Sequence, residues 1–139
     1  MNLDYKSIYD ITADAGIKVK AKDLKSLFCA SILATFNEIT DIDKVEQKEE
    51  YEIQAQNELP FLLADIINKA LVLHESKKFV ASRCEIMDLD DNFVKVKLIG
   101  ERFDPQKHPS KLVIKAATYH RLKIEKVGDH YEAEVIFDI

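Results

Sequence analysis

The chain has 139 residues and a mass of 16.0 kDa, the size of one domain. Hydrophobic residues make up 47% and charged residues 32%, with a formal net charge of -5, which argues against intrinsic disorder and against nonspecific nucleic-acid binding. No apolar run approaches the roughly 20 residues of a membrane-spanning helix, and Met1–Lys6 contains no apolar signal segment.

The first half of the chain predicts two strands and one amphipathic helix. Residues 5–10 resemble a short strand, and 15–21 alternate between apolar and polar residues as a half-buried strand does. Asp23 is placed to cap a helix, in which apolar residues then recur every three or four positions from Leu24 to Ile39. Residues 40–43 are expected to end that helix.

A further strand and a second helix follow. Residues 51–55 alternate with charged neighbours, and a helix is predicted from about Glu58 to Glu75, with Pro60 in its first turn. Its apolar positions are denser than those of the first helix, so it is expected to be the more buried. Lys77 and Lys78 suit its C-terminal end, where the helix dipole favours cations.

The second half of the chain predicts strands. Residues 79–87 and 93–99 flank a turn-rich connector and are expected to form an antiparallel hairpin. After a polar loop at 103–109, strands are expected at 112–118, 122–127 and 131–138. Because no repeat or linker divides the chain, residues 1–139 are predicted to form a single α+β domain, with two helices packed on mainly antiparallel sheet.

Two cysteines, Cys29 and Cys84, lie far apart and have no metal-ligand spacing. One falls in the helical pattern and the other in a strand pattern, so both are interpreted as buried free thiols. This interpretation predicts a reducing compartment and therefore a cytoplasmic protein.

Charge is unevenly distributed along the chain. Residues 40–58 hold seven acids and two lysines, whereas residues 101–126 hold seven bases and three acids. Either segment could provide a docking surface that steers a protein partner, although a solvated face is the commoner reason for such a pattern.

The sequence contains no phosphate-binding glycine loop, nucleophile elbow or zinc-protease motif, so nothing local indicates an enzyme. Three segments remain of interest: residues 11–16, residues 115–120 and the C-terminal residues 137–139. At the last of these, a free α-carboxylate follows Asp138, and such hard oxygen ligands suit Ca²⁺, Mg²⁺ or Mn²⁺. A carboxylate at a chain end is nevertheless more often simply solvated.

The order of several short motifs resembles the archease family along nearly the whole chain. Thr12, Ala13, Asp14 and Gly16 match a His-Thr-Ala-Asp-x-Gly segment near the start of the family pattern. The further matching residues are Leu27-Phe28, Asp43-Lys44-Val45-Glu46, Gly100-Glu101, Phe103-Asp104-Pro105, His108, Lys115-Ala116, Thr118-Tyr119-His120 and Phe137-Asp138-Ile139.

This resemblance implies a non-enzymatic accessory protein. Archeases assist the RtcB-type RNA ligase, which joins RNA ends left by tRNA splicing or RNA damage, and they promote its GTP- and metal-dependent guanylylation and multiple turnover. A chaperone-like role toward a tRNA methyltransferase has also been attributed to the family. Neither a membrane nor strong direct nucleic-acid binding is implied.

The resemblance also implies a metal site formed by Asp14, Asp138 and the α-carboxylate of Ile139, which lie at opposite ends of the sequence. The expected cofactor is a divalent cation, Ca²⁺ in a crystal, with Mg²⁺ or Mn²⁺ as alternatives. Lys115 and His120 are further candidates, as contacts to the ligase or to nucleotide phosphate.

One position departs from the family pattern, because Ile11 stands where the family has histidine. This isoleucine could alter metal or ligase binding, or it could simply pack while Asp14 is unaffected. Two other function classes remain open: a metal-dependent hydrolase, which would turn over GTP or an RNA end alone, and a general chaperone, which would not need Asp138.

Overall fold

A computed structural model describes residues 3–9 and 14–139. It has two helices, α1 (Leu24–Ile39) and α2 (Phe61–Lys77), and a short 3-10 helix η1 (Ile42–Lys44). The strands are β1 (Tyr5–Ile8), β2 (Asp14–Ala21), β3 (Glu49–Gln56), β4 (Phe79–Leu89), β5 (Phe93–Arg102), β6 (Ala116–Ala117), β7 (Lys123–Val127) and β8 (His130–Asp138).

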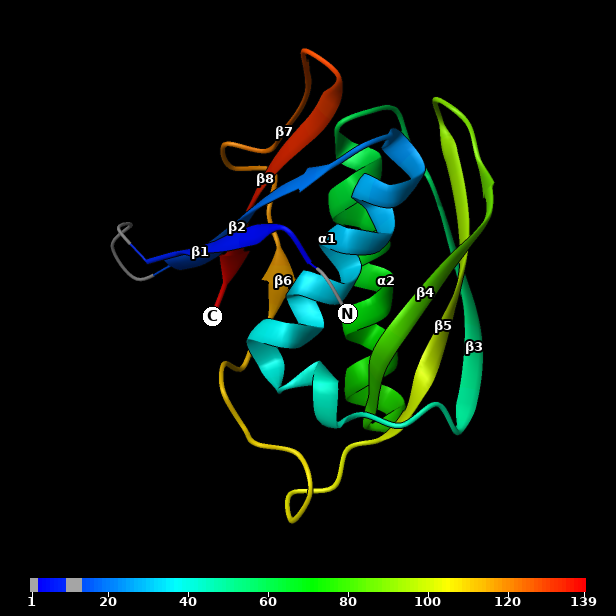
Figure 1. Ribbon diagram of the computed structural model, residues 1–139, viewed down its shortest axis with the longest axis vertical. Coiled ribbons are helices and arrows are strands. Elements are labelled where there is room, and N and C mark those ends of the chain that lie inside the picture. Colours follow the sequence, from blue (N-terminus) through cyan, green and yellow to red (C-terminus); the bar gives the residue numbers. More distant parts are fainter. Residues whose placement is uncertain (1–2, 10–13) are drawn as a thin grey trace.

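The strands form two antiparallel sheets, with the helices between them (Figure 1). One sheet has the order β1-β2-β8-β6, with β7 also paired to β8, and the other has the order β3-β5-β4. Helix α1 contacts β2 and β4, and α2 contacts β3 and β6, so each helix touches both sheets. The predicted α+β class is confirmed.

The two helices differ in how much of each is buried. Helix α1 has ten buried residues among its 16, including Glu38 and Thr35, whereas α2 has seven among its 17. The prediction that the second helix would be the more buried is therefore wrong. The buried residues of α1 include three polar ones, Ser31, Thr35 and Glu38, which a count of apolar residues along the sequence does not reveal.

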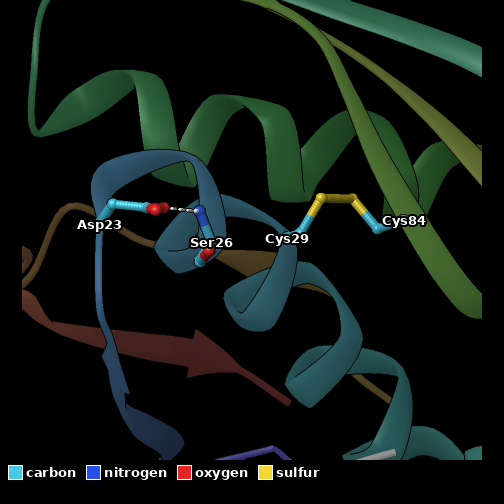
Figure 2. The surroundings of a disulfide bond; sticks show 4 residues. All are labelled: Asp23, Ser26, Cys29 and Cys84. Carbon is cyan, nitrogen blue, oxygen red and sulfur yellow. Dashed lines mark hydrogen bonds between the residues drawn. A yellow bond between two sulfur atoms is a disulfide. The ribbon is translucent and has the colours of Figure 1, made fainter.

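The start of α1 forms as predicted. The carboxylate of Asp23 accepts a hydrogen bond from the backbone N–H of Ser26 at 2.8 Å (Figure 2), and this bond lowers the pKa of Asp23. The second helix begins at Phe61 and not at Glu58, because Pro60 occupies its N-cap position. Lys78 ends that helix in the left-handed conformation, with a φ of 56°.

The prediction of free thiols is wrong, because Cys29 and Cys84 form a disulfide that joins α1 to β4 (Figure 2). The two cysteines are 55 residues apart, and both are half-buried. The inference of a reducing compartment loses its support with this pairing. Across the described residues, no helix is long and apolar enough to cross a membrane.

The predicted strand at 112–118 is also mostly wrong. Only Ala116 and Ala117 pair with β8, although the hairpin of β4 and β5 and the strands β7 and β8 lie close to their predicted positions.

Candidate functional site

Asp14 and Asp138 lie opposite each other in neighbouring antiparallel strands. Asp14 is the first residue of β2, Asp138 is the last residue of β8, and the two are direct Cα partners in the register. Asp14 is half-buried, and Asp138 is exposed. The ends of the sequence therefore meet at one end of this sheet, where Figure 1 places the C-terminus beside β1 and β2.

Gly16 permits the close approach of these two strands. A Cβ atom at this position would lie 2.6 Å from the carbonyl oxygen of Val135 and 2.9 Å from Cδ1 of Ile136. Both contacts are shorter than a side chain tolerates, and the first is to backbone, which cannot rotate away. The glycine two residues after Asp14 thus keeps β2 within pairing distance of β8.

Lys115 lies beside the same strand end. Its backbone N–H donates to the carbonyl oxygen of Asp138 at 2.8 Å, and the next residue, Ala116, is the Cα partner of Asp138. Its exposed side chain has no carboxylate within 4 Å in the part of the chain that the structure describes. The structure thus brings Asp14, Asp138 and Lys115 to one edge of the sheet.

His120 lies farther along, in the turn between β6 and β7. Its backbone N–H donates to Oγ1 of Thr118 at 3.3 Å, and its ring is exposed. In residues 3–9 and 14–139 no contact joins this ring to Asp14 or Asp138.

Its neighbour Tyr119 does have a side-chain partner. The hydroxyl of Tyr119 donates to Oδ1 of Asp65 at 2.6 Å, and this bond raises the pKa of Tyr119.

The donor set at the strand ends consists of oxygen atoms. Within the described ranges, no group of three or more His, Cys, Asp or Glu side chains is placed to hold a metal ion. Asp14 and Asp138 supply two carboxylates, and an α-carboxylate at Ile139 would supply a third. Ca²⁺ takes six to eight oxygen ligands, so these groups could form part of a site whose remaining ligands come from water or from another molecule.

A second group of charged residues, which the sequence did not mark as a site, surrounds the carboxylate of Glu101 at the end of β5. This side chain is buried, and its Oε2 accepts from the backbone N–H of Glu46 at 2.7 Å, from Nζ of Lys107 at 2.7 Å and from Nε2 of His108 at 3.0 Å. Burial by itself raises the pKa of Glu101, but these hydrogen bonds outweigh it and lower the pKa to about 2.

His108 contributes to this cluster as a neutral side chain in a defined tautomer. Its Nδ1 accepts a hydrogen bond from the backbone N–H of Asp104 at 2.8 Å, so its proton lies on Nε2, which faces Glu101. The ring is 1% exposed. Glu101 and His108 therefore fix the loop after β5. Both residues belong to the short motifs noted in the sequence, and that membership was the one sequence feature that could have identified this cluster.

A third cluster joins β1 to the end of α1. Glu38, which is buried, accepts hydrogen bonds from the hydroxyls of Tyr5 at 2.9 Å and Tyr9 at 3.2 Å. Burial raises the pKa of Tyr5 to about 12. Of the predicted motif that precedes β2, Ile11, Thr12 and Ala13 lie outside the described residues.

Comparisons with known proteins agree with this fold. A model of the Archease protein family (MTH1598/TM1083) matches residues 5–139. The "Protein archease" of Pyrococcus abyssi is 36% identical over 136 residues, covering 94% of this chain and 96% of that protein. The "Protein archease" of Sulfurisphaera tokodaii is 35% identical over 133 residues, with the same coverage of 94% and 96%.

Two solved structures are similar to the chain. The solution structure of protein 1598 from Methanobacterium thermoautotrophicum has a TM-score of 0.79 and 28% identity, covering 99% of this chain and 98% of that one. The crystal structure of an archease, described as a possible chaperone, from Thermotoga maritima has a TM-score of 0.58 and 24% identity, covering 95% of each chain. At that identity the second likeness shows the fold alone.

Proposed function

Because this chain belongs to the archease family, we propose that it is a non-enzymatic accessory protein that activates an RNA ligase of the RtcB type. In this role it promotes the GTP- and metal-dependent guanylylation of the ligase and its multiple turnover, in tRNA splicing or RNA repair. The proposal places the protein in the cytoplasm, where it would meet the ligase.

The observation that carries the proposal is the pairing of Asp14 with Asp138 across β2 and β8. Two carboxylates at an exposed strand end, with the α-carboxylate of Ile139, are hard oxygen donors suited to Ca²⁺, Mg²⁺ or Mn²⁺. A divalent cation bound there would neutralise negative charge on a triphosphate.

The proposal assigns a separate role to each residue at the strand ends. Asp14 and Asp138 would bind the cation at a position accessible to solvent, since Asp138 is exposed and Asp14 only half-buried. Lys115, whose backbone N–H group donates to the carbonyl oxygen of Asp138, would contact an anionic group of the ligase or its nucleotide. His120 is assigned a similar contact on the neighbouring turn.

The direct test is guanylylation of the ligase by GTP and Mn²⁺, with and without this protein. We expect wild-type protein to stimulate the reaction, and Asp14→Ala or Asp138→Ala to reduce that stimulation roughly tenfold or more, because a ligand of the cation is lost. Asp129→Ala is the matched control, since Asp129 lies at the opposite end of β8 in the turn from β7 and is fully exposed.

The possible results test the ligase-activator role and the metal site separately. If wild-type protein gives no stimulation at any GTP or Mn²⁺ concentration, the ligase assignment is wrong. If all four proteins stimulate equally, the ligase assignment stands and the metal site is wrong. Hydrolysis of GTP by the purified protein alone would favour a metal-dependent hydrolase instead.

A chaperone-like role toward a tRNA methyltransferase, which membership of the archease family also implies, is the second candidate. It predicts that the protein suppresses aggregation of a tRNA methyltransferase and that Asp138→Ala does so as well as wild type.

A further inference from the structure

Residues 111–116 have the side-chain pattern of a strand, but only the last of them, Ala116, has a partner among the described strands. Leu112 is half-buried and Ile114 is 7% exposed, whereas Lys111, Val113 and Lys115 point outward. Val113 is 81% exposed, the highest value among the large hydrophobic residues described. The first residue paired with β8 is Ala116, opposite Asp138 at the end of that strand, and the N–H group of Lys115 donates to the Asp138 carbonyl oxygen.

Some backbone N–H groups of this segment have a hydrogen-bond acceptor among the described residues and others do not. Lys111 and Leu112 donate to the carbonyl oxygens of Ile39 and Glu38 at the end of α1, each at 3.0 Å. Ala117 exchanges two hydrogen bonds with the side chain of Asn68, at 2.7 and 3.0 Å, which closes that part of the strand edge. Between them, the N–H groups of Val113 and Ile114 donate no hydrogen bond to any described residue.

A groove lies beside this open stretch. It has a volume of about 540 Å³ and runs between residues 113–116 and the C-terminal half of α2. Val113 and Val72, which is 63% exposed, supply its apolar rim. These two exposed valines offer apolar contact area to an occupant of the groove.

The charges around the groove are predominantly positive. Lys78 and Lys115 line it, and neither has a carboxylate within 4 Å in the described parts of the chain; the single acid of the lining is Glu75. Lys111 lies at the adjoining end of the same segment. Such a rim attracts acidic groups.

We propose that this groove binds an extended, acidic segment of a partner protein, which lies beside residues 112–115 and pairs with the backbone at Val113 or Ile114, the two residues whose N–H groups have no partner among the described residues. Consecutive N–H groups of an extended chain point to opposite edges, so the added strand accepts from one of the two unpaired N–H groups. The two valines contact side chains of the added strand, and Lys78 and Lys115 pair with its acids. Exposed valines and strand-type backbone donors suit a peptide better than the phosphates of a nucleic acid. The proposal does not depend on the metal site.

The probe is a capped hexapeptide of alternating valine and glutamate, titrated into the full-length protein and followed by NMR. We expect the amides of Val113 and Ile114 to shift, and the one whose N–H group faces the added strand to become protected from hydrogen exchange, because it gains a hydrogen bond. The same peptide with alternate N-methylated residues cannot complete the strand pairing, and a valine–lysine peptide carries the wrong charge, so neither is expected to bind.

Two variants test the surface. Val113→Asp and Lys78→Glu are each expected to weaken binding about tenfold or more, because they place negative charge against the acidic peptide. The matched controls are Val127→Asp, an exposed valine of β7, and Lys69→Glu, an exposed lysine of α2 outside the groove lining, and each should change affinity by less than about twofold. The NMR spectrum of each free variant shows that it remains folded.

Several results would overturn the proposal. One is the absence of binding at millimolar peptide, and another is binding that Val113→Asp and Lys78→Glu leave unchanged. Self-association of the wild type that Val113→Asp abolishes would identify a second copy as the occupant, and saturable binding of a single-stranded RNA with the same sensitivity would identify a nucleic acid. Asp14→Ala and Asp138→Ala should bind the peptide normally, which separates this test from that of the metal site.

Discussion

At the scale of single residues, Glu101 shows how one carboxylate can fix a loop. It is buried, yet three donors from residues 46, 107 and 108 converge on one of its oxygens, so the charged form is more stable in the folded protein than in water. Lys107 also bonds Glu46 at 2.6 Å, which ties the segment before β3 to the loop after β5.

We therefore expect Glu101→Gln to lower the free energy of unfolding by about 2 kcal/mol near neutral pH, because charged hydrogen bonds to a buried group are lost. Urea unfolding measures this change. Glu85→Gln is the matched control, since the Arg83–Glu85 pair at 2.9 Å is largely exposed and should contribute less than about 1 kcal/mol. Equal effects of the two substitutions would contradict the assigned role.

The same site predicts a pH dependence with a defined sign. The pKa of Glu101 is lowered from 4.5 to about 2 on folding, so its stabilising effect is complete above about pH 4.5 and is lost as the pH falls toward 2. The difference in stability between wild type and Glu101→Gln should narrow over that interval. Unfolding curves at pH 6, 4 and 3 measure it, and a constant difference would contradict the assignment.

At the scale of elements, the disulfide links two elements that belong to different layers. Cys29 lies in α1 and Cys84 in β4, which is an edge strand of its three-stranded sheet. The pairing restricts the unfolded chain by closing a loop between positions 55 residues apart.

Reduction of this disulfide is expected to lower the free energy of unfolding by about 2–4 kcal/mol. Thermal unfolding with and without dithiothreitol measures the effect, and thiol titration reports the state of the two cysteines. In the double variant Cys29→Ser, Cys84→Ser the reductant should have no effect. An identical unfolding temperature for oxidised and reduced wild type would show that the bond does not stabilise the fold.

At the scale of the whole molecule, the candidate metal site depends on the pairing of two strands that lie at opposite ends of the sequence. β2 and β8 are in register over eight residue pairs, from Asp14–Asp138 to Ala21–Tyr131. A change in their separation therefore alters the distance between the two carboxylates without removing either of them.

Gly16→Ala tests this dependence, because its methyl group would meet the Val135 carbonyl and push β2 away from β8. We expect a loss of about 1–3 kcal/mol in stability and weaker binding of Mn²⁺, measured by calorimetry. Gly128→Asn is the control: Gly128 has a φ of 63°, which asparagine tolerates, and no atom lies within 4 Å of its Cβ position. Unchanged binding in Gly16→Ala would contradict the proposed geometry.

The sequence by itself determined the local structure of most of the chain. Alternation defined β2 and β8, spacings of three and four residues defined α1, and Asp23 marked its first turn. These patterns succeed because they arise from the strand and helix repeats and from a capping bond three residues away.

Only the tertiary structure decided which elements meet. The Cys29–Cys84 bond, the convergence of residues 46, 107 and 108 on Glu101, and the missing strand partner of residues 112–114 all depend on distances between segments that are remote in sequence. Residues 112–115 have the side-chain alternation of a strand, but pairing requires a second backbone at hydrogen-bonding distance, and no property of those residues alone specifies where that backbone lies.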